Sequence, residues 1–325
     1  MKKSTVIIPN WNGKKFLKEC LDSLLEQEGG APDIILVDNG SGDGSVSFIK
    51  EYYPSVSVIE FQENMGFCKA VNAGIKAAKT EYVILLNNDT KADKYFVHRL
   101  EERIGKSEKF FSVSAKMMSL HHPETVDDAG DYYCALGWAY ALGKGKKDSE
   151  AYSHTRKIFA SCAGAAIYRK EIFEEIGYFD ENHFAYLEDI DVGYRARIYG
   201  YYNVFEPSAL VWHAGSATSG SKYNEFKVNF SSRNSIYIIR KNMPLIQRII
   251  NLPFFVAGFM IKTLFFAKKG YGKIYIQGLW KGYVLSRSVE GCEKKVKFRG
   301  EHLKNYLVIQ WELWGNIFRR FISGK

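Results

Sequence analysis

The sequence predicts an α/β protein whose central sheet is mostly parallel and carries helices on both faces. Two observations lead to this prediction. In the first half of the chain, short β-branched runs alternate with segments of helical periodicity. One of these runs, DIILVD at 33–38, is apolar throughout its middle, which is typical of a strand buried on both faces of a parallel sheet.

The individual elements follow from the same patterns. Strands are expected at 4–9, 33–38, 56–61 and 81–89, and the helices between them at 14–27, 44–53 and 66–79. Further strands are expected at 163–169, 202–205 and 209–213, with a helix within 184–200. Residues 117–157 are irregular and polar and predict a loop that faces a substrate. Beyond residue 220 the pattern is helical.

The composition is that of a folded protein. The chain has 325 residues, of which 46% are apolar and 25% charged, enough for one large domain or two. Its cysteines are odd in number and lack CxxC spacing, which argues against a disulfide framework or structural zinc site and favours a reducing compartment. The apolar run of MKKSTVIIPN ends at Pro9, so we expect no signal peptide and a cytoplasmic protein.

Charge is distributed unevenly. Residues 1–239 hold 28 Lys and Arg against 32 Asp and Glu, a net charge of −4. Residues 240–325 hold 17 against 4, a net charge of +13. This asymmetry predicts an anionic partner for the C-terminal region, either a membrane surface or a nucleic acid.

The C-terminal region also contains an apolar segment within 245–270. Its run LPFFVAGFMIKTLFFA (252–267) is 16 residues long and is interrupted by Lys262, whereas a membrane span needs ~20 residues. Two interpretations remain open. The segment is either an interfacial helix on the anionic cytoplasmic leaflet, or a helix packed under the rest of the chain or in a homodimer interface.

Polar residues follow three of the predicted strands, in PNWNG, VDNGSGDGS and NNDT. The carboxyl ends of parallel strands meet at one edge of a sheet, where ligands bind. The glycines at 40, 42 and 44 resemble a dinucleotide-binding turn, but the third glycine of that motif would fall on Ser45 and the turn follows the wrong strand. Asp38 closes a buried strand and either accepts a hydrogen bond from a nucleobase or caps the turn.

A second strand end points to a metal. In VILLNNDT (83–90), four apolar residues lead to Asn87, Asn88 and Asp89, whose oxygens suit Mg²⁺ or Mn²⁺ together with phosphate groups. The alternative is that Asp89 caps a helix. His213 ends another strand, and is either a metal ligand or an ordinary core or surface histidine.

The segment FAYLEDIDVGYRARIYG (184–200) has carboxylates in its first helical turn and arginines in its last. This arrangement matches the helix dipole, worth a few tenths to ~1 kcal/mol per charge. Asp191 and Arg195 are four residues apart and are expected to pair on the surface. Asp189 lies about 200° around the helix from Asp191, so the two cannot share one face. Asp191 is then the structural carboxylate, and Asp189 is free for chemistry.

These motifs occur together in an order that resembles the family 2 glycosyltransferases, inverting enzymes with the GT-A fold, and especially their rhamnosyltransferase-like branch, which acts on surface polysaccharides. The resemblance covers roughly residues 4–242. It rests on VIIPNWNG (6–13), ILVDNGSGDGS (35–45), ENMGFCKAVNAGI (63–75), VILLNNDT (83–90), GAAIYRKEIFEEIGYFDENHFAYLEDIDVGYRARIYGY (164–201) and VWHAGSAT (211–218).

The resemblance implies a division of the chain and a role for each motif. Residues 1–242 would form the catalytic domain, with a nucleotide-sugar half (1–116) and an acceptor half (117–242), followed by a basic helical region (243–325). The residues that would bind the donor are Pro9, Asn10, Asn12, Asp38 on the base, Asn64, Gly66, Asn72, Asn87 and Asn88.

The chemical groups are also assigned by the resemblance. Asp89 would bind Mg²⁺ or Mn²⁺ as the last residue of an Asp-x-Asp motif in which Asn87 replaces the first aspartate, and His213 would be a further ligand. Asp189 would be the catalytic base, with Glu188 and Asp191 on the acceptor side. Inverting transfer needs one base to deprotonate the acceptor hydroxyl and one cation to offset charge on the leaving diphosphate.

The resemblance therefore predicts a glycosyltransferase that uses a UDP-, dTDP- or GDP-linked sugar and a glycan or lipid-linked acceptor. A processive synthase is disfavoured, because the chain lacks several spanning segments and a Gln-x-x-Arg-Trp motif. Two alternatives remain: an inactive GT-A adaptor that only binds nucleotide, and a nucleic-acid-binding protein that uses the basic tail. With the glycosyltransferase interpretation no nucleic acid is expected.

Overall fold

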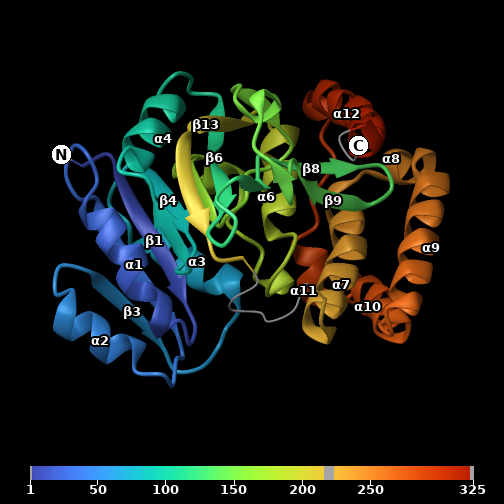
Figure 1. The fold of residues 1–325 in the computed structure, drawn as a ribbon. Coiled ribbons are helices and arrows are strands. Elements are labelled where there is room, and N and C mark those ends of the chain that lie inside the picture. Colours follow the sequence, from blue (N-terminus) through green and yellow to red (C-terminus); the bar gives the residue numbers. More distant parts are fainter. Residues whose placement is uncertain (1, 216–222, 323–325) are drawn as a thin grey trace.

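The computed structural model describes residues 2–215 and 223–322, and the SAT of the last family motif (216–218) lies outside them. Its centre is one large mixed sheet with helices on both sides (Figure 1). The parallel part consists of β3 (Ser57–Phe61), β2 (Asp33–Asn39), β1 (Ser4–Asn10) and β4 (Tyr82–Leu86), in that order across the sheet. This part of the fold was correctly predicted.

The other part of the sheet is mixed. Strand β12 (Ala165–Arg169) runs antiparallel between β4 and β6 (Phe110–Ser119). The long strand β13 (Tyr202–His213) is parallel to β6 and antiparallel to β5 (Thr90–Ala92) and β11 (Arg156–Ile158). The two strands predicted at 202–205 and 209–213 are therefore one strand, with an irregular pairing between Glu206 and Leu210.

Each face of the sheet has its own apolar core. On one face, residues of β1 such as Val6 and Ile8 pack with α1 (Lys14–Leu25), α2 (Ser45–Tyr52) and α4 (Phe96–Ile104). On the other face, Ile7 packs with α3 (Phe67–Ala77), α5 (Ile172–Ile176) and α6 (Glu188–Ile198). The alternation of Val6, Ile7 and Ile8 between faces is the two-residue period of a strand.

Residues 117–157 were expected to be an irregular loop, and this prediction is wrong. The segment holds the end of β6, β7 (Thr125–Asp128), β8 (Asp131–Cys134), β9 (Trp138–Ala141), β10 (Lys146–Lys147) and the 3₁₀ turn η1 (Glu150–Tyr152). These strands are short and lack a clear alternation, but Tyr132 and Tyr133 are buried. Aromatic burial against elements distant in sequence outweighs the weak local pattern.

The C-terminal region is helical, as predicted. It contains α7 (Glu225–Asn242), α8 (Leu245–Ile250), α9 (Leu252–Lys268), α10 (Gly272–Leu285), α11 (Val289–Glu293), η3 (Gly300–His302) and α12 (Leu303–Ile322). Helices α7 and α10 pack closely, and two glycines of α10 allow this approach. A Cβ on Gly278 would lie 1.8 Å from Ser232 Oγ, and a Cβ on Gly282 would lie 2.0 Å from the Arg233 carbonyl oxygen. Among the described residues, no helix is both long and apolar enough to span a bilayer.

Candidate active site

A hydrogen-bonded polar network joins the ends of the three central strands. Asn10 Nδ2 donates to Asp38 Oδ1 at 2.9 Å, and Asn88 Nδ2 donates to Asn10 Oδ1 at 2.7 Å. The other carboxylate oxygen of Asp38 accepts from the backbone N–H of Ser41 at 2.9 Å. Asp38 therefore orders the turn after β2, and its remaining lone pairs are the ones a nucleobase could use.

The neighbouring loop residues are held in the same way. Asn12 has a left-handed backbone, with φ of 51°, which asparagine tolerates better than most residues. Its N–H donates to Ser41 Oγ, and its Oδ1 accepts from the N–H of Gly42 at 2.9 Å. Pro9, beside Val37 in the sheet, precedes this loop. These contacts place the predicted nucleotide-binding residues of β1 and β2 side by side.

Gly66 brings the predicted donor half against the predicted acceptor half. Its φ is 85°, and a Cβ would lie 2.6 Å from the ring of Phe184. The next residue, Phe67, donates its N–H to the Phe184 carbonyl at 2.7 Å. Asn64 Oδ1 accepts from the N–H of Gly66 and so fixes this turn. Only glycine fits here, because both the left-handed backbone and the close ring exclude a side chain.

Asn72 joins the same two halves further along α3. Its Nδ2 donates to the Phe179 carbonyl at 2.8 Å, and its Oδ1 accepts from the Phe179 N–H at 3.1 Å. The residue is 3% exposed. Its amide is therefore engaged in joining the chain, whereas the resemblance implied that it borders the donor.

Asp89 and His213 face each other after β4 and at the end of β13. The distance from His213 Nε2 to Asp89 Oδ1 is 3.2 Å, and His213 Nδ1 lies 2.8 Å from Asp127 Oδ2. Burial lowers the pKa of His213, but its hydrogen bonds to Asp127 and Asp89 outweigh this and raise the pKa to about 9. Asn87 lies two residues before Asp89, and its backbone N–H donates a hydrogen bond to the Gly164 carbonyl oxygen at 2.9 Å.

The donor set fits a divalent cation once the cation replaces the proton on His213 Nε2, because a histidine ligand is neutral. Two ligand atoms each ~2.1 Å from one ion and at right angles are ~3 Å apart, close to the separation of His213 Nε2 and Asp89 Oδ1. Asp127 accepts from the other ring nitrogen, as the outer partner of a metal-bound histidine does. A second carboxylate–histidine cluster, Asp180, His183 and Asp191, does not fit a cation, because the ammonium of Lys241 already lies 2.7 Å from Asp180 and 2.8 Å from Asp191.

The helix that carries the predicted base begins in a strained turn. Phe184, Tyr186 and Leu187 have φ of 61°, 70° and 68°, a backbone region that costs about 1–3 kcal/mol for such residues. For this reason α6 begins at Glu188, so that Glu188, Asp189 and Asp191 lie in its first turn, as predicted. Asn234 of α7 holds the turn, donating from Nδ2 to the carbonyls of His183, Ala185 and Tyr186 at 2.7–3.0 Å.

We therefore expect Asn234→Ala to lower transfer about 10- to 100-fold while donor affinity changes little, since small misplacement of a catalytic group is costly. The turn loses the two N–H donors that Asn234 Nδ2 shares among three carbonyls and relaxes, which moves Asp189. Steady-state kinetics gives the effect, and calorimetry with nucleoside diphosphate gives the binding control. Asn229→Ala, five residues earlier on the same helix, is the matched variant; an equal loss there would contradict a local role for Asn234.

Asp189 lies in a cluster of acids. Its side chain is hydrogen-bonded to Asp131, and Asp128 and Cys162 lie close to Asp131. Burial, followed by the charge of Asp128, raises the pKa of Asp131 well above its usual range. Burial also raises the pKa of Asp189, but the N–H of Ile190 and the hydrogen bond from Asp131 partly offset this. Asp131, whose pKa is raised more strongly, is therefore the donor in this hydrogen bond, and Asp189 is the acceptor.

Glu188 is next to this cluster at the start of α6. Its Oε2 is buried and has no hydrogen-bond partner among the described residues. Burial and the charge of Asp189 raise the pKa of Glu188 to about 8. Glu188 is thus neutral when Asp189 is charged, so it can donate a hydrogen bond to a bound hydroxyl.

Asp191 lies on another side of α6, away from the acid cluster around Asp189. Arg195 Nη2 lies 2.9 Å and Lys241 Nζ 2.8 Å from its Oδ2, and Asn242 Nδ2 donates to its Oδ1 at 2.9 Å. The predicted pair with Arg195 exists, but its expected surface location is wrong, because Asp191 is 0% exposed. Although burial opposes its charge, Lys241 and Arg195 hold the pKa of Asp191 well below the usual range.

Comparison with known proteins shows the family to which this chain belongs. The sequence profile of "Glycosyl transferase family 2" matches residues 5–177, more than half of the chain. The chain belongs to this family. It is 23% identical over 245 residues to a poly-β-1,6-N-acetyl-D-glucosamine synthase of Staphylococcus epidermidis, which covers 73% of this chain and 56% of that protein. The chain thus spans little more than half the length of this curated relative.

Two solved structures also have a fold similar to that of this chain. The mannosyltransferase PcManGT from Pyrobaculum calidifontis, in complex with GDP-Man and Mn²⁺, has a TM-score of 0.54 and 15% identity over 90% of this chain and 86% of that one. S. aureus TarS 1–349 with UDP-GlcNAc has a TM-score of 0.55 and 17% identity, covering 95% and 90%. Both similarities establish the GT-A fold; the rhamnosyltransferase-like branch stays a prediction.

Several site residues were not found in the family 2 motifs of the sequence. Asp127, Asp128 and Asp131 come from the stretch expected to be a loop, and Asn234 comes from a helical segment to which no role was assigned. The Asp-Asp pair at 127–128 was the one available signal, but two adjacent acids are common on surfaces. Only the pairing of β7 with β6 and of β8 with Ala160 carries them to the site.

Proposed function

We propose that the protein transfers a sugar, with inversion, from a nucleoside-diphosphate donor to a hydroxyl of a glycan or lipid-linked acceptor. The observation that carries the proposal is the pair of centres described above. Asp89 and His213 form a cation-binding pair beside the polar strand ends, and Asp189 forms a carboxylate stabilised by a protonated neighbour. Inverting transfer needs these two kinds of group.

In this reaction Asp189 takes the proton from the acceptor hydroxyl as its oxygen attacks the anomeric carbon, and the bond to the diphosphate breaks on the opposite side. Glu188 orients the acceptor. The donor lies along Asn10, Asn12, Asp38, Asn64, Gly66 and Asn88. Asp89 and His213 would hold Mg²⁺ or Mn²⁺, which supplies positive charge to the leaving diphosphate. Asn87 leaves this centre with one carboxylate fewer than an Asp-x-Asp site.

The proposal also covers the binding partners of the protein and its location in the cell. The donor is a UDP-, dTDP- or GDP-sugar, and surface polysaccharide synthesis, including a rhamnosyl transfer, fits the acceptor class. The protein would work in the cytoplasm, with residues 245–270 in contact with the membrane or with a second copy of the chain. The relatives named above support this proposal through the donors in their titles.

Calorimetry with a panel of UDP-, dTDP- and GDP-sugars and Mn²⁺ or Mg²⁺ tests the donor centre. We expect Asp89→Ala to weaken the metal-dependent affinity by at least about 10- to 100-fold, the cost of losing even an outer partner of a metal site. Asp93→Ala, four residues further along, is the control. Unchanged affinity in Asp89→Ala would remove Asp89 from the centre, and binding without transfer in the wild type would favour the inactive adaptor.

A further inference from the structure

A pocket in the C-terminal region is lined by cations. It lies between the end of α7, α8 and the segment after α11, and has a volume of about 400 Å³. A neighbouring cavity of about 230 Å³ shares Arg248, Cys292 and Lys295 with it. The basic residues around the two cavities are Arg240, Arg248, Arg287, Lys295 and Lys297, and no carboxylate is among their lining residues. We call this the cation pocket.

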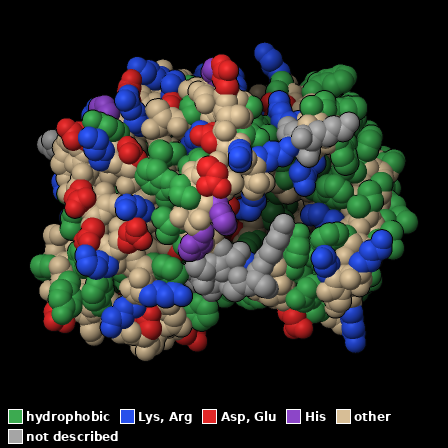
Figure 2. Space-filling model, viewed as in Figure 1, with side chains coloured by type: hydrophobic (Ala, Val, Ile, Leu, Met, Phe, Trp, Pro, Cys, Tyr) green, Lys and Arg blue, Asp and Glu red, His purple; other side chains and the backbone are tan. Residues whose placement is uncertain are grey.

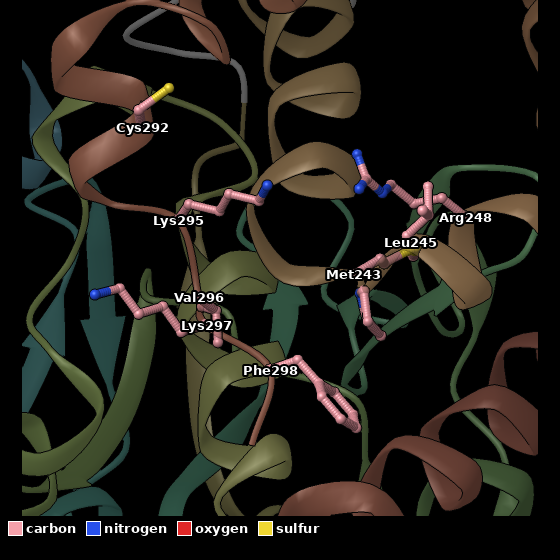
Figure 3. A pocket seen from close by; sticks show the side chains of 9 residues that line it. Met243, Leu245, Arg248, Cys292, Lys295, Val296, Lys297 and Phe298 are labelled. Atoms are coloured by element: carbon pink, nitrogen blue, oxygen red, sulfur yellow. The ribbon is translucent and has the colours of Figure 1, made fainter. Parts of the chain in front are cut away.

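The cations of the cation pocket have no protein counter-ion in the part of the chain that the structure describes. Among the described residues, no carboxylate lies within ion-pair distance of Arg240, Arg248 or Lys295, and the buried Nε atoms of both arginines have no hydrogen-bond partner. Burial, and then the charge of Arg240, lower the pKa of Arg248. Figure 3 shows the side chains of Arg248 and Lys295 pointing toward each other across the cavity. Like charges held together in this way are stabilised by a bound anion.

One wall of the cation pocket is apolar. Met243, Leu245, Val296 and Phe298 line it, and Leu245 and Phe298 are 64% and 52% exposed. A free inorganic anion has no apolar surface and would gain nothing from contact with these side chains. A phosphate group that carries a hydrocarbon chain would satisfy both the cations and the apolar side chains.

The pocket also borders an unusual amount of exposed apolar surface. Helix α8 supplies Leu245 and Arg248 to the pocket, while its Ile246 and Ile249 are 73% and 58% exposed. On α9, Met260 and Leu264 are 60% and 63% exposed, and Trp280 of α10 is 65% exposed. Figure 2 shows hydrophobic side chains gathered on the side of the molecule where Figure 1 places α8 and α9.

This surface combines the features of an interfacial anchor. Exposed aliphatic and Trp side chains lie in a region with 17 Lys and Arg against 4 Asp and Glu. Amphipathic helices with such charge bind anionic bilayers, and apolar residues insert below the phosphate level. Helix α8 would then place Arg248 at the depth of the phosphates.

We propose that the cation pocket binds the phosphate of an anionic membrane lipid, with α8 and α9 lying on the bilayer. Arg248 and Lys295 are the principal ligands, and Leu245 and Phe298 contact the acyl chains. This inference is independent of the transfer reaction, because binding is measured without a donor sugar.

Sedimentation of the full chain with phosphatidylcholine vesicles containing phosphatidic acid tests the proposal. Lys295→Glu is compared with Lys294→Glu, its exposed neighbour outside the pocket, so that both variants change the net charge equally. Arg248→Gln is compared with Arg299→Gln, which is exposed and paired with Glu301. We expect each pocket variant to lower vesicle affinity about 10-fold more than its control, the value of a charged hydrogen bond. Equal losses would overturn the pocket and leave only diffuse attraction.

The source of the phosphate is tested by competition. A soluble short-chain phosphatidic acid should displace the wild-type protein from vesicles, and inorganic phosphate at the same concentration should not. Equal competition by inorganic phosphate would overturn the lipid assignment, since the apolar wall would then contribute nothing. Equal affinity for single-stranded RNA, with the same pocket variants defective, would overturn it in favour of a nucleic acid. The exposed Lys295 cannot disturb the core, so Lys295→Glu remains informative if Arg248→Gln unfolds.

Discussion

Asp189→Asn is expected to lower sugar transfer by about 10²- to 10⁴-fold, the usual contribution of a positioned base. The amide cannot accept the proton of the acceptor hydroxyl. It can still bond to Asp131, so the fold and the donor site should be preserved. Single-turnover kinetics with a radiolabelled donor gives the rate, and calorimetry with the nucleoside diphosphate gives the affinity, which should remain within a few-fold of wild type.

Asp131→Asn is the matched variant, because it makes the same chemical change on the other member of the hydrogen-bonded pair. Asp131 holds the shared proton, so an amide can replace it as the donor to Asp189. Most of the transfer activity should therefore remain. If the two variants behaved in the opposite way, Asp131 would be the base. Wild-type turnover in both would remove the acid cluster from the chemistry.

Asp191→Asn is expected to lower the free energy of unfolding by ~3–5 kcal/mol, because it leaves Arg195 buried without its carboxylate and Lys241 with only the carboxylate of Asp180. Asp33→Asn is the control: its pair with Lys2 is exposed, at 57% and 50%, and such pairs contribute ~0–1 kcal/mol. Urea unfolding at neutral pH measures both variants. Similar values for the two would contradict a stabilising role for the buried network.

The same network predicts a dependence on pH. The pKa of Asp191 is lowered in the folded protein from the ordinary value of 3.8. Its stabilisation is therefore complete above pH 3.8 and is lost as the pH falls below that value. Wild-type stability should fall over this acidic range, and the Asp191→Asn variant should show a shallower fall. Parallel curves for the two proteins would assign the acid sensitivity to other groups.

Much of the sheet was predictable because its strands are buried on both faces. The apolar middle of DIILVD predicts β2, and the polar residues that follow β1, β2 and β4 predict the edge where the site lies. The strained turn before α6 could not be predicted, since Phe184, Tyr186 and Leu187 have no preference for a left-handed backbone. The turn is imposed by Asn234, which lies 48 residues beyond Tyr186.

The burial of Asp191 could not be predicted from the local sequence either. Its spacing to Arg195 predicts a surface pair, and nothing near it indicates the partner Lys241, 50 residues later. The acids of residues 127–131 were missed for the same reason, because short strands with few β-branched residues give no periodic signal. Motifs at the strand ends were found, whereas the contacts that Asn234, Lys241 and residues 127–131 make with distant elements were not.

The packing of α12 has a consequence for synthesis on the ribosome. Helix α12 covers α6 and β8: Tyr133, Tyr194, Tyr306 and Leu313 share one apolar cluster, and Arg197 pairs with Glu312, 115 residues away. The parallel strands β1 to β4 can pair as soon as they emerge from the exit tunnel, since domains fold progressively during translation. The helix bearing Asp189 stays uncovered until α12 has emerged, so the nascent chain completes its parallel strands first and the surroundings of Asp189 much later.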